Sequence, residues 1–459
     1  MTVAILGLGS SGDAAARLAL VQGDHPYVSD LRTDAATAAR AAHLEELGAD
    51  VELGAHDLDR IAAADVVVVS PGIPPHAPVL VELRRRGCRW VSEPDYAARF
   101  YRAPLIGVTG TNGKTTTTLL IAHLLREAGV PVGVGGNVGG GLAPAASDLA
   151  LLEPAPAWFV VEVSSFQLAD TATFAPDIGV VTNLAPDHLD RYASVAEYWA
   201  DKAHLFDRAD ADSRWVLADQ PEVVALSGDR PGRRYLFSTT RTEGVHAFLR
   251  DGVLTLRVDE GAGDGSDDGA EESLVAIEAL PLLGLHNVAN ALAAALAVRL
   301  AGVPAASIAA GLMTASALPH RMEPVGERDG VVWVNDSKAT NVAATVSAVV
   351  SAGAPLVLLL GGFDKGESLD PLVASLPGPV RAAVCFGAAG PRFAARLREV
   401  EGLALHEAAD LAGAVALART LAQAGDWILL SPASSSFDEF DNYEARGRRF
   451  AALAVEEAA

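Results

Sequence analysis

Residues 105–116 decide the fold class, and they read Leu105-Ile106-Gly107-Val108-Thr109-Gly110-Thr111-Asn112-Gly113-Lys114-Thr115-Thr116. An apolar run passes into a glycine-containing turn and then into a stretch expected to be helical as far as Gly129. The glycines allow backbone N–H groups to close on phosphate oxygens, Lys114 is spaced to reach the β- and γ-phosphates, and Thr115 can bind Mg²⁺. The general motif has glycine six residues before the lysine, where this chain has Val108. The stretch therefore predicts a variant phosphate loop of the ATP-binding type.

The same order of apolar run, glycine or serine turn and Ala/Leu-rich helical stretch recurs along the chain. The runs expected to be strands are Val3–Leu6, Asp65–Val69, Leu105–Thr109, Trp158–Val163, Ile178–Thr182, Val331–Val334, Leu356–Leu360, Ala382–Phe386 and Trp427–Leu430. Strands that alternate with helices predict parallel sheets built from βαβ units, and hence an α/β fold. Such sheets bind ligands beyond the carboxyl ends of their strands, so the residues after each run are the candidate site residues.

The chain has 459 residues, which at roughly 150 residues per domain predicts three domains. Changes of pattern near residues 92–103 and 318–321 divide it into 1–92, 93–318 and 319–459. We expect Rossmann-like first and last domains around a central domain that carries the phosphate loop. The Gly- and acid-rich stretch Asp259–Glu272 is expected to be a solvated loop of the central domain.

Charge and cysteine content limit the kind of protein. With 35 Lys+Arg against 58 Asp+Glu, the net charge of −23 argues against binding nucleic acid or an anionic membrane. Cys88 and Cys385 are expected to be core thiols of a reducing cytosol rather than a disulfide. The chain starts with a strand-like run instead of a signal peptide, and no run approaches the roughly 18 apolar residues of a membrane span. These features predict a cytoplasmic protein.

The first domain carries a nucleotide-binding pattern. Gly7-Leu8-Gly9-Ser10-Ser11-Gly12 follows a strand and opens a helix, and Asp30 ends the next expected strand. This pattern predicts a nucleotide diphosphate, either of a dinucleotide or of a UDP-sugar. Ser70-Pro71-Gly72 follows another strand and either closes the same site or forms a simple turn.

Candidate metal and ligand residues follow strands of the central domain. Glu162 ends a strand beside the phosphate loop, where a carboxylate is well placed to bind Mg²⁺, and His188 in Asp187-His188 is a further candidate ligand. Lys202 lies on a helix that opens with the capping box Ser194–Glu197, and its spacing alone favours a solvated lysine. Polar residues at the head of the helix Asn290–Leu300 suggest either ligand contact or capping; they are His286, Asn287 and Asn290.

Three loops of the last domain follow strands of one predicted sheet and should share an edge. They are Asn335–Asn341, Gly361–Lys365 and Ser431–Asp438. Together they supply two lysines, several hydroxyl groups and a helix N-terminus, which predicts a site for a small, strongly anionic ligand.

Across nearly the whole chain, these motifs resemble the Mur ligase family, in particular its members that act on D-glutamate. The resemblance is carried by Gly7–Gly12, Ser70–Gly72, Gly110–Thr115, Glu162–Leu168, Asn183, Asp187–Tyr192, His286–Asn287 with Asn290, Pro319–Arg321, Asn335–Asn341 and Ser431–Ala433 with Ser436, Phe437, Asp438 and Phe440.

The resemblance implies a role for each group of residues. UDP-substrate contacts would come from Ser10, Ser11, Asp30, Arg32, Gly72 and Asn137. ATP contacts would come from Gly110, Thr111, Asn112, Gly113, Lys114, Thr115, Thr116, Asn287, Asn290, Arg321, Asp336 and Lys338. D-glutamate contacts would come from Thr340, Lys365, Ser436, Phe437 and Tyr443, where Tyr443 brings a hydroxyl to a position expected to be aromatic. Two Mg²⁺ ions would be bound by Thr115, Glu162, His188 and Lys202, the last as a carbamate, and the catalytic set would be Lys114, His188 and Lys202.

The implied activity is ATP-dependent ligation of D-glutamate to UDP-N-acetylmuramoyl-L-alanine through an acyl phosphate, in peptidoglycan precursor synthesis, by a monomer. Relatives that add diaminopimelate or lysine would show Asp-Asn-Pro-Arg in the last domain, which this chain lacks. Folylpolyglutamate synthetases share the ATP loop but lack the nucleotide-sugar domain. An NAD-dependent dehydrogenase would leave Gly110–Thr115 and the last domain unexplained, and a nucleotide-switch protein would use the phosphate loop alone.

Overall fold

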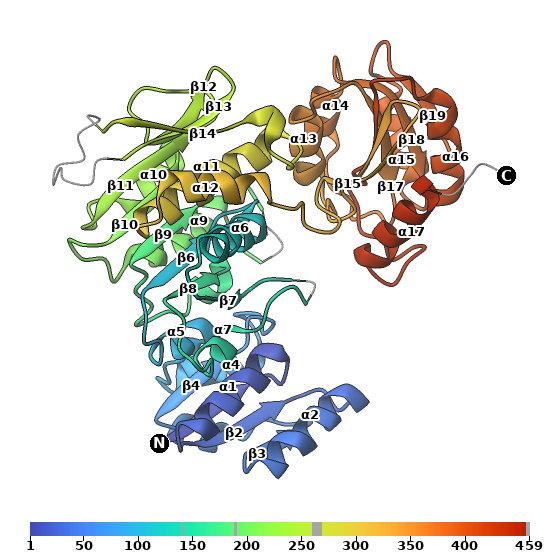
Figure 1. The fold of residues 1–459 in the computed structure, drawn as a ribbon. Helices are drawn as coiled ribbons and strands as arrows, with labels where there is room; N and C mark the ends of the chain where they lie inside the picture. The colour runs from blue at the N-terminus through green and yellow to red at the C-terminus, as the bar shows by residue number, and fades with distance from the viewer. Residues whose placement is uncertain (140, 188–190, 259–268, 456–459) are drawn as a thin grey trace. The chain divides into compact units, whose positions relative to one another are not determined.

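The computed structural model describes residues 1–139, 141–187, 191–258 and 269–455. The chain separates into two compact units (Figure 1). The first unit contains Met1–Val275 and Asn290–Gly311, and the second contains Ala276–Ala289 and Leu312–Ala459. The first unit holds two β-sheets and the second holds one.

The first sheet has the strand order β3-β2-β1-β4-β5, and every strand pair is parallel. Its strands are β1 (Thr2–Leu6), β2 (His25–Asp30), β3 (Asp50–Leu53), β4 (Val66–Val69) and β5 (Val91–Ser92). Its helices are α1 (Ser10–Val21), α2 (Ala35–Glu46), α3 (Leu58–Ala63), α4 (Pro78–Arg85) and α5 (Glu93–Ala98). Because β2 and β4 flank β1 on opposite sides, the strand order reverses at β1, and a ligand crevice opens at the carboxyl ends of β1 and β4.

The second sheet has nine strands in the order β14-β13-β12-β11-β10-β9-β6-β8-β7. They are β6 (Leu105–Thr109), β7 (Val132–Gly136), β8 (Trp158–Glu162), β9 (Ile178–Val181), β10 (Arg214–Ala218), β11 (Arg233–Ser238), β12 (Ala247–Arg250), β13 (Val253–Arg257) and β14 (Glu271–Ala276). The pairs from β7 to β12 are parallel, and β12 pairs antiparallel with β13. Strand β6 is fully buried between β8 and β9, so its end brings the phosphate loop to the middle of the sheet edge.

Helices connect and flank these strands. They are α6 (Lys114–Glu127), α7 (Ala146–Leu149), α8 (Ser165–Leu168), α9 (Val195–Ala203), α10 (Pro221–Ser227), α11 (Leu285–Leu300) and α12 (Ala305–Met313), with 3₁₀ turns at His204–Phe206 and Ile277–Ala279. The Ser194 side chain caps α9 by accepting from the Glu197 N–H at 3.2 Å, while the Glu197 carboxylate accepts from the Ala193 N–H instead of completing the predicted capping box.

Buried hydrogen bonds join the two sheets of the first unit. The Asp95 carboxylate accepts from the backbone N–H groups of Ala172, Thr173 and Phe174 at 2.9, 2.6 and 2.7 Å. The Ser92 N–H donates to the Asp170 carbonyl at 2.7 Å. Since these groups are buried or half-buried, breaking them would leave polar atoms unsatisfied, which explains why both sheets belong to one unit.

The third sheet, in the second unit, has the order β15-β16-β20-β17-β18-β19. Its strands are β15 (Glu323–Arg328), β16 (Val331–Asn335), β17 (Leu356–Gly361), β18 (Val380–Phe386), β19 (Ala404–Glu407) and β20 (Trp427–Leu430). Only β15 runs antiparallel to its neighbour among the described pairs. An apolar cluster packs on each face, under α13 (Val342–Val350), α14 (Asp370–Ser375) and α15 (Gly390–Leu397) on one side and α16 (Leu411–Leu421) and α17 (Tyr443–Val455) on the other.

The three mainly parallel sheets confirm the predicted α/β fold, and every run expected to be a strand contains one. The predicted loop Asp259–Glu272 extends too far, because Glu271 and Glu272 begin β14. Residues 259–268 of this loop lie outside the described residues. No helix in the described part of the chain is both long and apolar enough to cross a membrane.

Candidate active site

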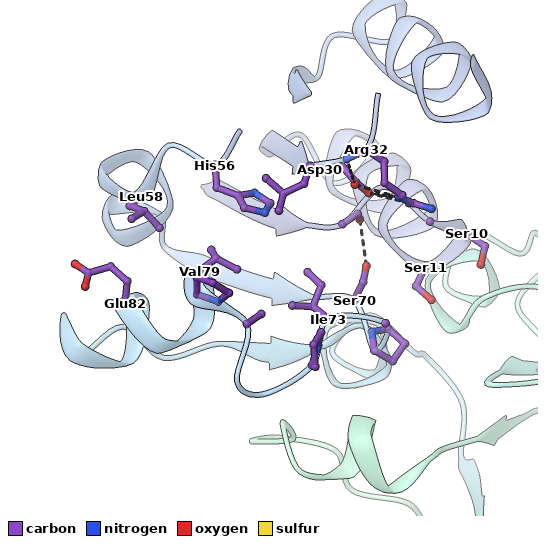
Figure 2. Close-up of a pocket in the computed structure, with 18 residues that line it drawn as sticks. Ser10, Ser11, Asp30, Arg32, His56, Leu58, Ser70, Ile73, Val79 and Glu82 are labelled. Carbon is purple, nitrogen blue, oxygen red and sulfur yellow. Dashed lines mark hydrogen bonds and ion pairs between the residues drawn. The ribbon is translucent and has the colours of Figure 1, made fainter. Parts of the chain in front are cut away.

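A cavity of about 930 Å³ opens at the carboxyl ends of β1, β2 and β4 (Figure 2). Five of the six residues predicted to bind the UDP-substrate line it: Ser10, Ser11, Asp30, Arg32 and Gly72. Ser10 and Ser11 start α1, so the helix N-terminus borders the cavity and favours an anionic group there. The cavity is large enough for a small-molecule ligand.

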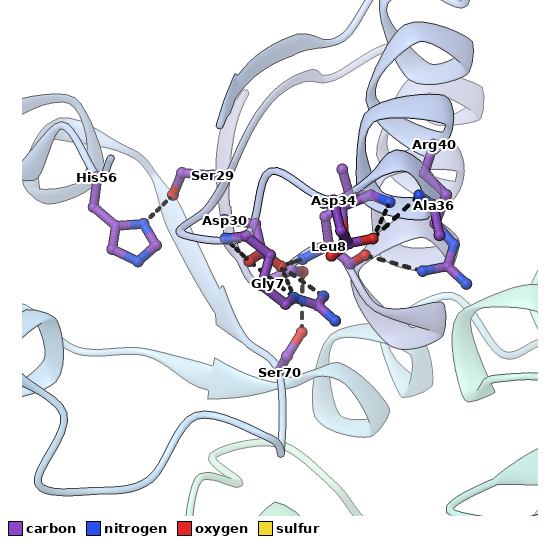
Figure 3. Close-up of polar contacts among 11 residues, drawn as sticks. Gly7, Leu8, Ser29, Asp30, Asp34, Ala36, Arg40, His56 and Ser70 are labelled. Atoms are coloured by element: carbon purple, nitrogen blue, oxygen red, sulfur yellow. Dashed lines mark hydrogen bonds and ion pairs between the residues drawn. The ribbon is translucent and has the colours of Figure 1, made fainter. Parts of the chain in front are cut away.

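Glycine is required at two positions of the first turn. Gly7 has a φ of +93°, and a Cβ there would lie 2.9 Å from the Ser70 Cβ. A Cβ at Gly12 would lie 1.9 Å from the Gly7 carbonyl oxygen, which no side chain can tolerate. The Ser70 hydroxyl donates to the same carbonyl at 3.1 Å, so the segment after β4 is fastened to the turn (Figure 3). Ser70 therefore belongs to the turn after β4 and also lines the cavity.

Asp30 organises the mouth of this cavity from within the protein. Its carboxylate accepts from the Leu8 N–H at 2.7 Å and from the Arg32 N–H and guanidinium at 2.8 Å (Figures 2 and 3). Burial opposes its ionisation, but the hydrogen bonds from Arg32 and Leu8 outweigh burial and lower the pKa of Asp30 to about 2. Asp30 is thus a charged anchor that holds both the turn and Arg32 in place.

The phosphate loop joins β6 to α6 with glycines in conformations that other residues avoid. Gly113 has a φ of +79°, and a Cβ there would lie 2.3 Å from the Asn290 Oδ1; at Gly110 it would lie 2.0 Å from the Thr182 Oγ1. Thr111 and Asn112 donate their N–H groups to the Asn183 carbonyl and side-chain oxygens at 3.0 and 2.9 Å. The loop is therefore packed tightly between β9 and the head of α11.

Lys114 curls back over this loop, where its ammonium group donates to the carbonyls of Gly110 at 3.1 Å and Thr111 at 2.7 Å. Thr115 is buried and Thr116 half-buried in the first turn of α6. Asn290 accepts a hydrogen bond from the Thr117 hydroxyl at 3.3 Å, so it lies against α6 as well as the loop. Asn287 donates its side-chain N–H to the Leu283 carbonyl at 2.8 Å, within the second unit.

Glu162 ends β8, the strand next to β6, and is 2% exposed. Burial at this edge excludes the reading of Glu162 as an ordinary surface acid. Its carboxylate accepts from the Asn137 side-chain amide at 3.2 Å, and its carbonyl accepts from the Asn137 N–H at 2.9 Å. Asn137, predicted to contact the UDP-substrate, thus lies beside Glu162 and not among the residues that line the 930 Å³ cavity.

Lys202 is 1% exposed, so the solvated lysine that its helical spacing favoured is wrong. Its ammonium donates to the Gly110 carbonyl at 2.8 Å and lies 4.6 Å from the centre of the Tyr198 ring. Burial, together with the nearby Lys114 charge, holds the pKa of Lys202 well below its usual value. This shift favours the neutral amine relative to an exposed lysine.

Of the four residues predicted to bind Mg²⁺, the structure describes three. His188 lies outside the described residues. Among the residues that are described, no group of three or more His, Cys, Asp and Glu side chains is arranged to hold a metal ion. Two of the predicted ligands, Thr115 and Glu162, are buried, as is Lys202.

In the second unit, Arg446 brings together the three loops that were predicted to share an edge. This fully buried guanidinium donates to the Ser337 hydroxyl and carbonyl at 3.0 and 2.9 Å. It also donates to the carbonyls of Gly361, Ser434 and Ser435 at 3.4, 3.0 and 3.1 Å. Burial lowers the pKa of Arg446 only to about 10, so it stays charged at neutral pH.

The residues predicted for D-glutamate lie on or beside these loops. Lys365 donates to the Thr340 carbonyl at 3.1 Å, and the Lys338 ammonium lies 4.0 Å from the centre of the Tyr443 ring. Ser436 is buried, whereas Phe437 is 69% exposed. Such an exposed aromatic ring is available to cover a ligand.

Asp336 lies at the end of β16 beneath the same edge. It accepts from the Ser431 hydroxyl at 2.8 Å and from the Met322 N–H at 3.2 Å. Burial raises the pKa of Asp336 to about 7, although these hydrogen bonds and the charge of Arg321 act in the opposite direction.

Comparison with known proteins decides the family. The model of the Mur ligase MurD-like N-terminal domain matches residues 1–92, the Mur ligase middle domain matches 108–298, and the Mur ligase glutamate ligase domain matches 320–434. The UDP-N-acetylmuramoylalanine–D-glutamate ligase of Acidobacterium capsulatum is 38% identical over 456 residues, covering 99% of this chain and 96% of that protein. Its counterpart in Anaeromyxobacter dehalogenans is 40% identical over 470 residues, covering 99% and 98%. The chain belongs to the Mur ligase family.

Solved Mur ligases share the fold of this Mur ligase. MurF from Thermotoga maritima, in complex with ADP, aligns with a TM-score of 0.62 at 14% identity over 98% of this chain and 96% of that one. MurC from Thermotoga maritima aligns with a TM-score of 0.58 at 19% identity over 99% of both chains. At these identities the likeness concerns the three-domain α/β fold alone.

Sequence reasoning missed two residues of this Mur ligase that the structure places at the sites. His56 lines the 930 Å³ cavity and its Nδ1 lies 2.8 Å from the Ser29 hydroxyl. Burial lowers the pKa of His56, so the ring favours its neutral form. Arg446 was missed as well. His56 follows β3, a strand that the sequence pattern did not reveal, and Arg446 lies within α17 and not at the end of a strand.

Proposed function

We propose that this Mur ligase joins D-glutamate to UDP-N-acetylmuramoyl-L-alanine with ATP as co-substrate, in the synthesis of peptidoglycan precursors. The main support is full-length similarity to curated ligases of that name. Further support is that the first unit has a 930 Å³ cavity beyond β1 and a separate phosphate loop beyond β6, which would give the two nucleotides separate sites.

The proposal divides the work among three domains. Residues 1–92 would bind the UDP moiety, 93–318 would bind ATP, and 319–459 would bind D-glutamate, with Asp336, Lys338 and Arg321 as proposed nucleotide contacts. The protein would act as a monomer in the cytoplasm, where ATP and UDP-linked precursors are available.

The chemistry needs ATP because an amine does not attack a free carboxylate at a useful rate. The alanyl carboxylate attacks the γ-phosphate, which yields an acyl phosphate and ADP. The D-glutamate amine then attacks the activated carbonyl, and phosphate leaves with its bonding electrons. Lys114 would exchange its two loop carbonyls for phosphate oxygens and so stabilise the charge on the transferred group.

The residues present fit a Mg²⁺ site. Glu162 is a buried carboxylate at the strand end, Thr115 offers a hydroxyl at the helix start, and Lys202 is a buried amine with a lowered pKa. A neutral amine can capture CO₂, which would convert Lys202 into an anionic carbamate suited to a metal. We propose that these three residues and His188 hold two Mg²⁺ ions; bound Mg²⁺ neutralises phosphate charge during the transfer.

For D-glutamate, the proposal uses the edge that Arg446 organises. Lys365 would pair with a substrate carboxylate, Thr340 and Ser436 would donate hydrogen bonds, and Phe437 and Tyr443 would cover the ligand. Lys365 is exposed and bound only to a backbone carbonyl of the described residues, so it can turn toward an anion at little cost.

The test is phosphate release with ATP, UDP-N-acetylmuramoyl-L-alanine and D-glutamate, with the product identified by mass. We expect release only when all three are present, and we expect Lys114→Ala to lower turnover by about a hundredfold or more, since lost charge stabilisation costs several kcal/mol. Equal turnover with meso-diaminopimelate or L-lysine, or tighter binding of NAD than of the UDP-substrate, would reject the proposal.

A further inference from the structure

A second cavity, of about 700 Å³, lies at the opposite end of β4 from the 930 Å³ cavity. Val66 and Val67 at the start of β4 line it, whereas Ser70, just after the end of β4, lines the 930 Å³ cavity. The remaining walls come from residues 62, 64 and 65 before β4, from Arg84 near the end of α4, from residues 87–91, from Arg99 and from residues 169–172 after α8. The two cavities are therefore separated by the length of a strand, and none of the roles proposed above involves the second one.

The acidic groups of this cavity are already hydrogen-bonded to the protein. The Asp65 carboxylate accepts from the Thr2 N–H at 2.7 Å and from its hydroxyl at 3.1 Å. The Asp170 carboxylate accepts from the Trp90 indole N–H at 2.9 Å. Burial raises the pKa of Asp170, with the nearby Arg84 charge acting more weakly in the opposite direction. These contacts fix the walls of the cavity.

The basic groups of this cavity are not all paired with carboxylates. Arg99 pairs with Asp95 at 3.2 Å, but within the described residues Arg84 and Arg89 form no ion pair. The neighbouring Arg85 and Arg86 differ, since both pair with Glu82 at 2.8 Å, and Arg86 also pairs with Asp59 at 2.7 Å. In a chain with a net charge of −23, two unpaired guanidinium groups on one cavity wall are a local excess of positive charge.

The cavity also offers an aromatic and a polar surface beside these cations. The Arg84 guanidinium carbon lies 5.3 Å from the centre of the Trp90 ring, and the Trp90 ring is in turn fixed by Asp170. Guanidinium groups present paired N–H donors that match phosphate oxygens. The volume lies within the range of about 300–1,000 Å³ that small-molecule sites occupy.

We propose that this cavity binds a small phosphorylated ligand, with its phosphate held by Arg84 and Arg89 and the remainder against Trp90. The proposal does not depend on the ligase reaction, because it rests on residues that take no part in it. Phosphate as a free ion and phosphate on an organic ligand share this chemistry, and the organic ligand should bind more tightly because it also contacts Trp90.

Cys88 provides the measurement, because it lines the cavity and is half-buried, while Cys385 is fully buried. Alkylation by iodoacetamide, a neutral reagent, is followed by peptide mass spectrometry with inorganic phosphate, ribose 5-phosphate or sodium chloride at matched ionic strength. We expect saturable slowing of Cys88 alkylation by both phosphates, at a lower concentration of ribose 5-phosphate, and none by chloride.

Two double variants complete the test. In R84Q/R89Q, the concentration of phosphate or ribose 5-phosphate needed for protection should rise about tenfold or more, since two charge-assisted bonding groups are lost. In R85Q/R86Q, which removes the same charge from the neighbouring ion-paired arginines, protection should be unchanged. Protection that chloride reproduces, or that survives in R84Q/R89Q, would overturn the site. Because all four arginines are exposed or ion-paired at the surface, both variants should fold, which circular dichroism verifies.

Discussion

Replacing Arg446 tests whether its buried guanidinium stabilises the three loops at which we propose that D-glutamate binds. Arg446→Met keeps an unbranched side chain of similar length but removes the guanidinium. Four backbone carbonyls and one hydroxyl then lose this donor inside a closed environment. The Ser435 carbonyl keeps the Phe363 N–H at 2.8 Å, and the Ser337 hydroxyl keeps the Tyr443 carbonyl at 2.9 Å, so not every one of the five is left unsatisfied. Each unsatisfied buried group costs about 1–3 kcal/mol. Relaxation and entering water recover part of this, so we expect the second unit to lose about 3–5 kcal/mol, the usual cost of breaking a buried charged network.

The expected damage is local to the loops around Ser337, Gly361 and Ser434–Ser435. Hydrogen exchange of peptides that cover these loops should become about a hundredfold faster or more, because each 1.4 kcal/mol changes an opening equilibrium tenfold. The KM for D-glutamate should rise more than the KM for the UDP-substrate, for which we propose a site in the first unit. Arg446→Lys should be nearly as damaging, since one ammonium group cannot reach five acceptors.

Arg448→Met, on the same helix but exposed, is the matched control and should change neither quantity. If Arg446→Met exchanged at the wild-type rate in these loops, or raised both KM values equally, then Arg446 would not organise this edge.

Three further results are expected. Lys202→Ala should be nearly inactive, and a short carboxylic acid in solution should restore part of the turnover by replacing the carbamate; full activity without the acid would exclude the metal role. Lys365→Ala should raise the KM for D-glutamate about tenfold or more, the value of one charge-assisted hydrogen bond, and leave that for ATP nearly unchanged; equal effects would place Lys365 elsewhere. Burial raises the pKa of Glu93 from 4.5 to about 7, so the folded state binds its proton more tightly than the unfolded state. Its contribution to stability is complete below about pH 4.5 and is lost as the pH rises through about 7, by at most about 3 kcal/mol; urea unfolding of Glu93→Gln should lack this decline, and an unchanged pH profile would contradict it.

The parallel strands that were predicted, among them β6, could be identified because burial on both faces leaves a continuous apolar signature, whereas the parallel strands β3, β5, β7, β10, β11 and β19 were missed. Leu105–Thr109 has the same bounds in the sequence and in the structure. Strands β12 and β13 were missed, although Asp251-Gly252 between them is a hairpin signal and both residues have positive φ, at 51° and 77°. Their short, uneven patterns become strands only through pairing with each other and with β11.

The candidate site residues also divide into those that the sequence identifies and those that it does not. Residues that follow a strand, such as Glu162 and Asp336, could be identified because parallel sheets collect polar groups at that edge. The burial of Lys202 could not be predicted from its own helix, because its side chain lies against the phosphate loop. Its partner there, the Gly110 carbonyl, is 92 residues away in the sequence. Arg446 likewise lies on a helix in which two exposed arginines, Arg448 and Arg449, follow within one turn, and nothing local distinguishes it from them.

The contacts of Lys202 and Lys365 have a practical consequence for chemical labelling. Only four of the 35 basic residues are lysine, and these are Lys114, Lys202, Lys338 and Lys365. Surface cations elsewhere are arginines, which acylating reagents leave untouched. An amine-directed reagent therefore modifies the lysines of the candidate sites and the N-terminal amine, with little reaction elsewhere. The exposed Lys365 should be acylated first and the buried Lys202 last, so the order of acylation along a time course maps how deeply each amine lies.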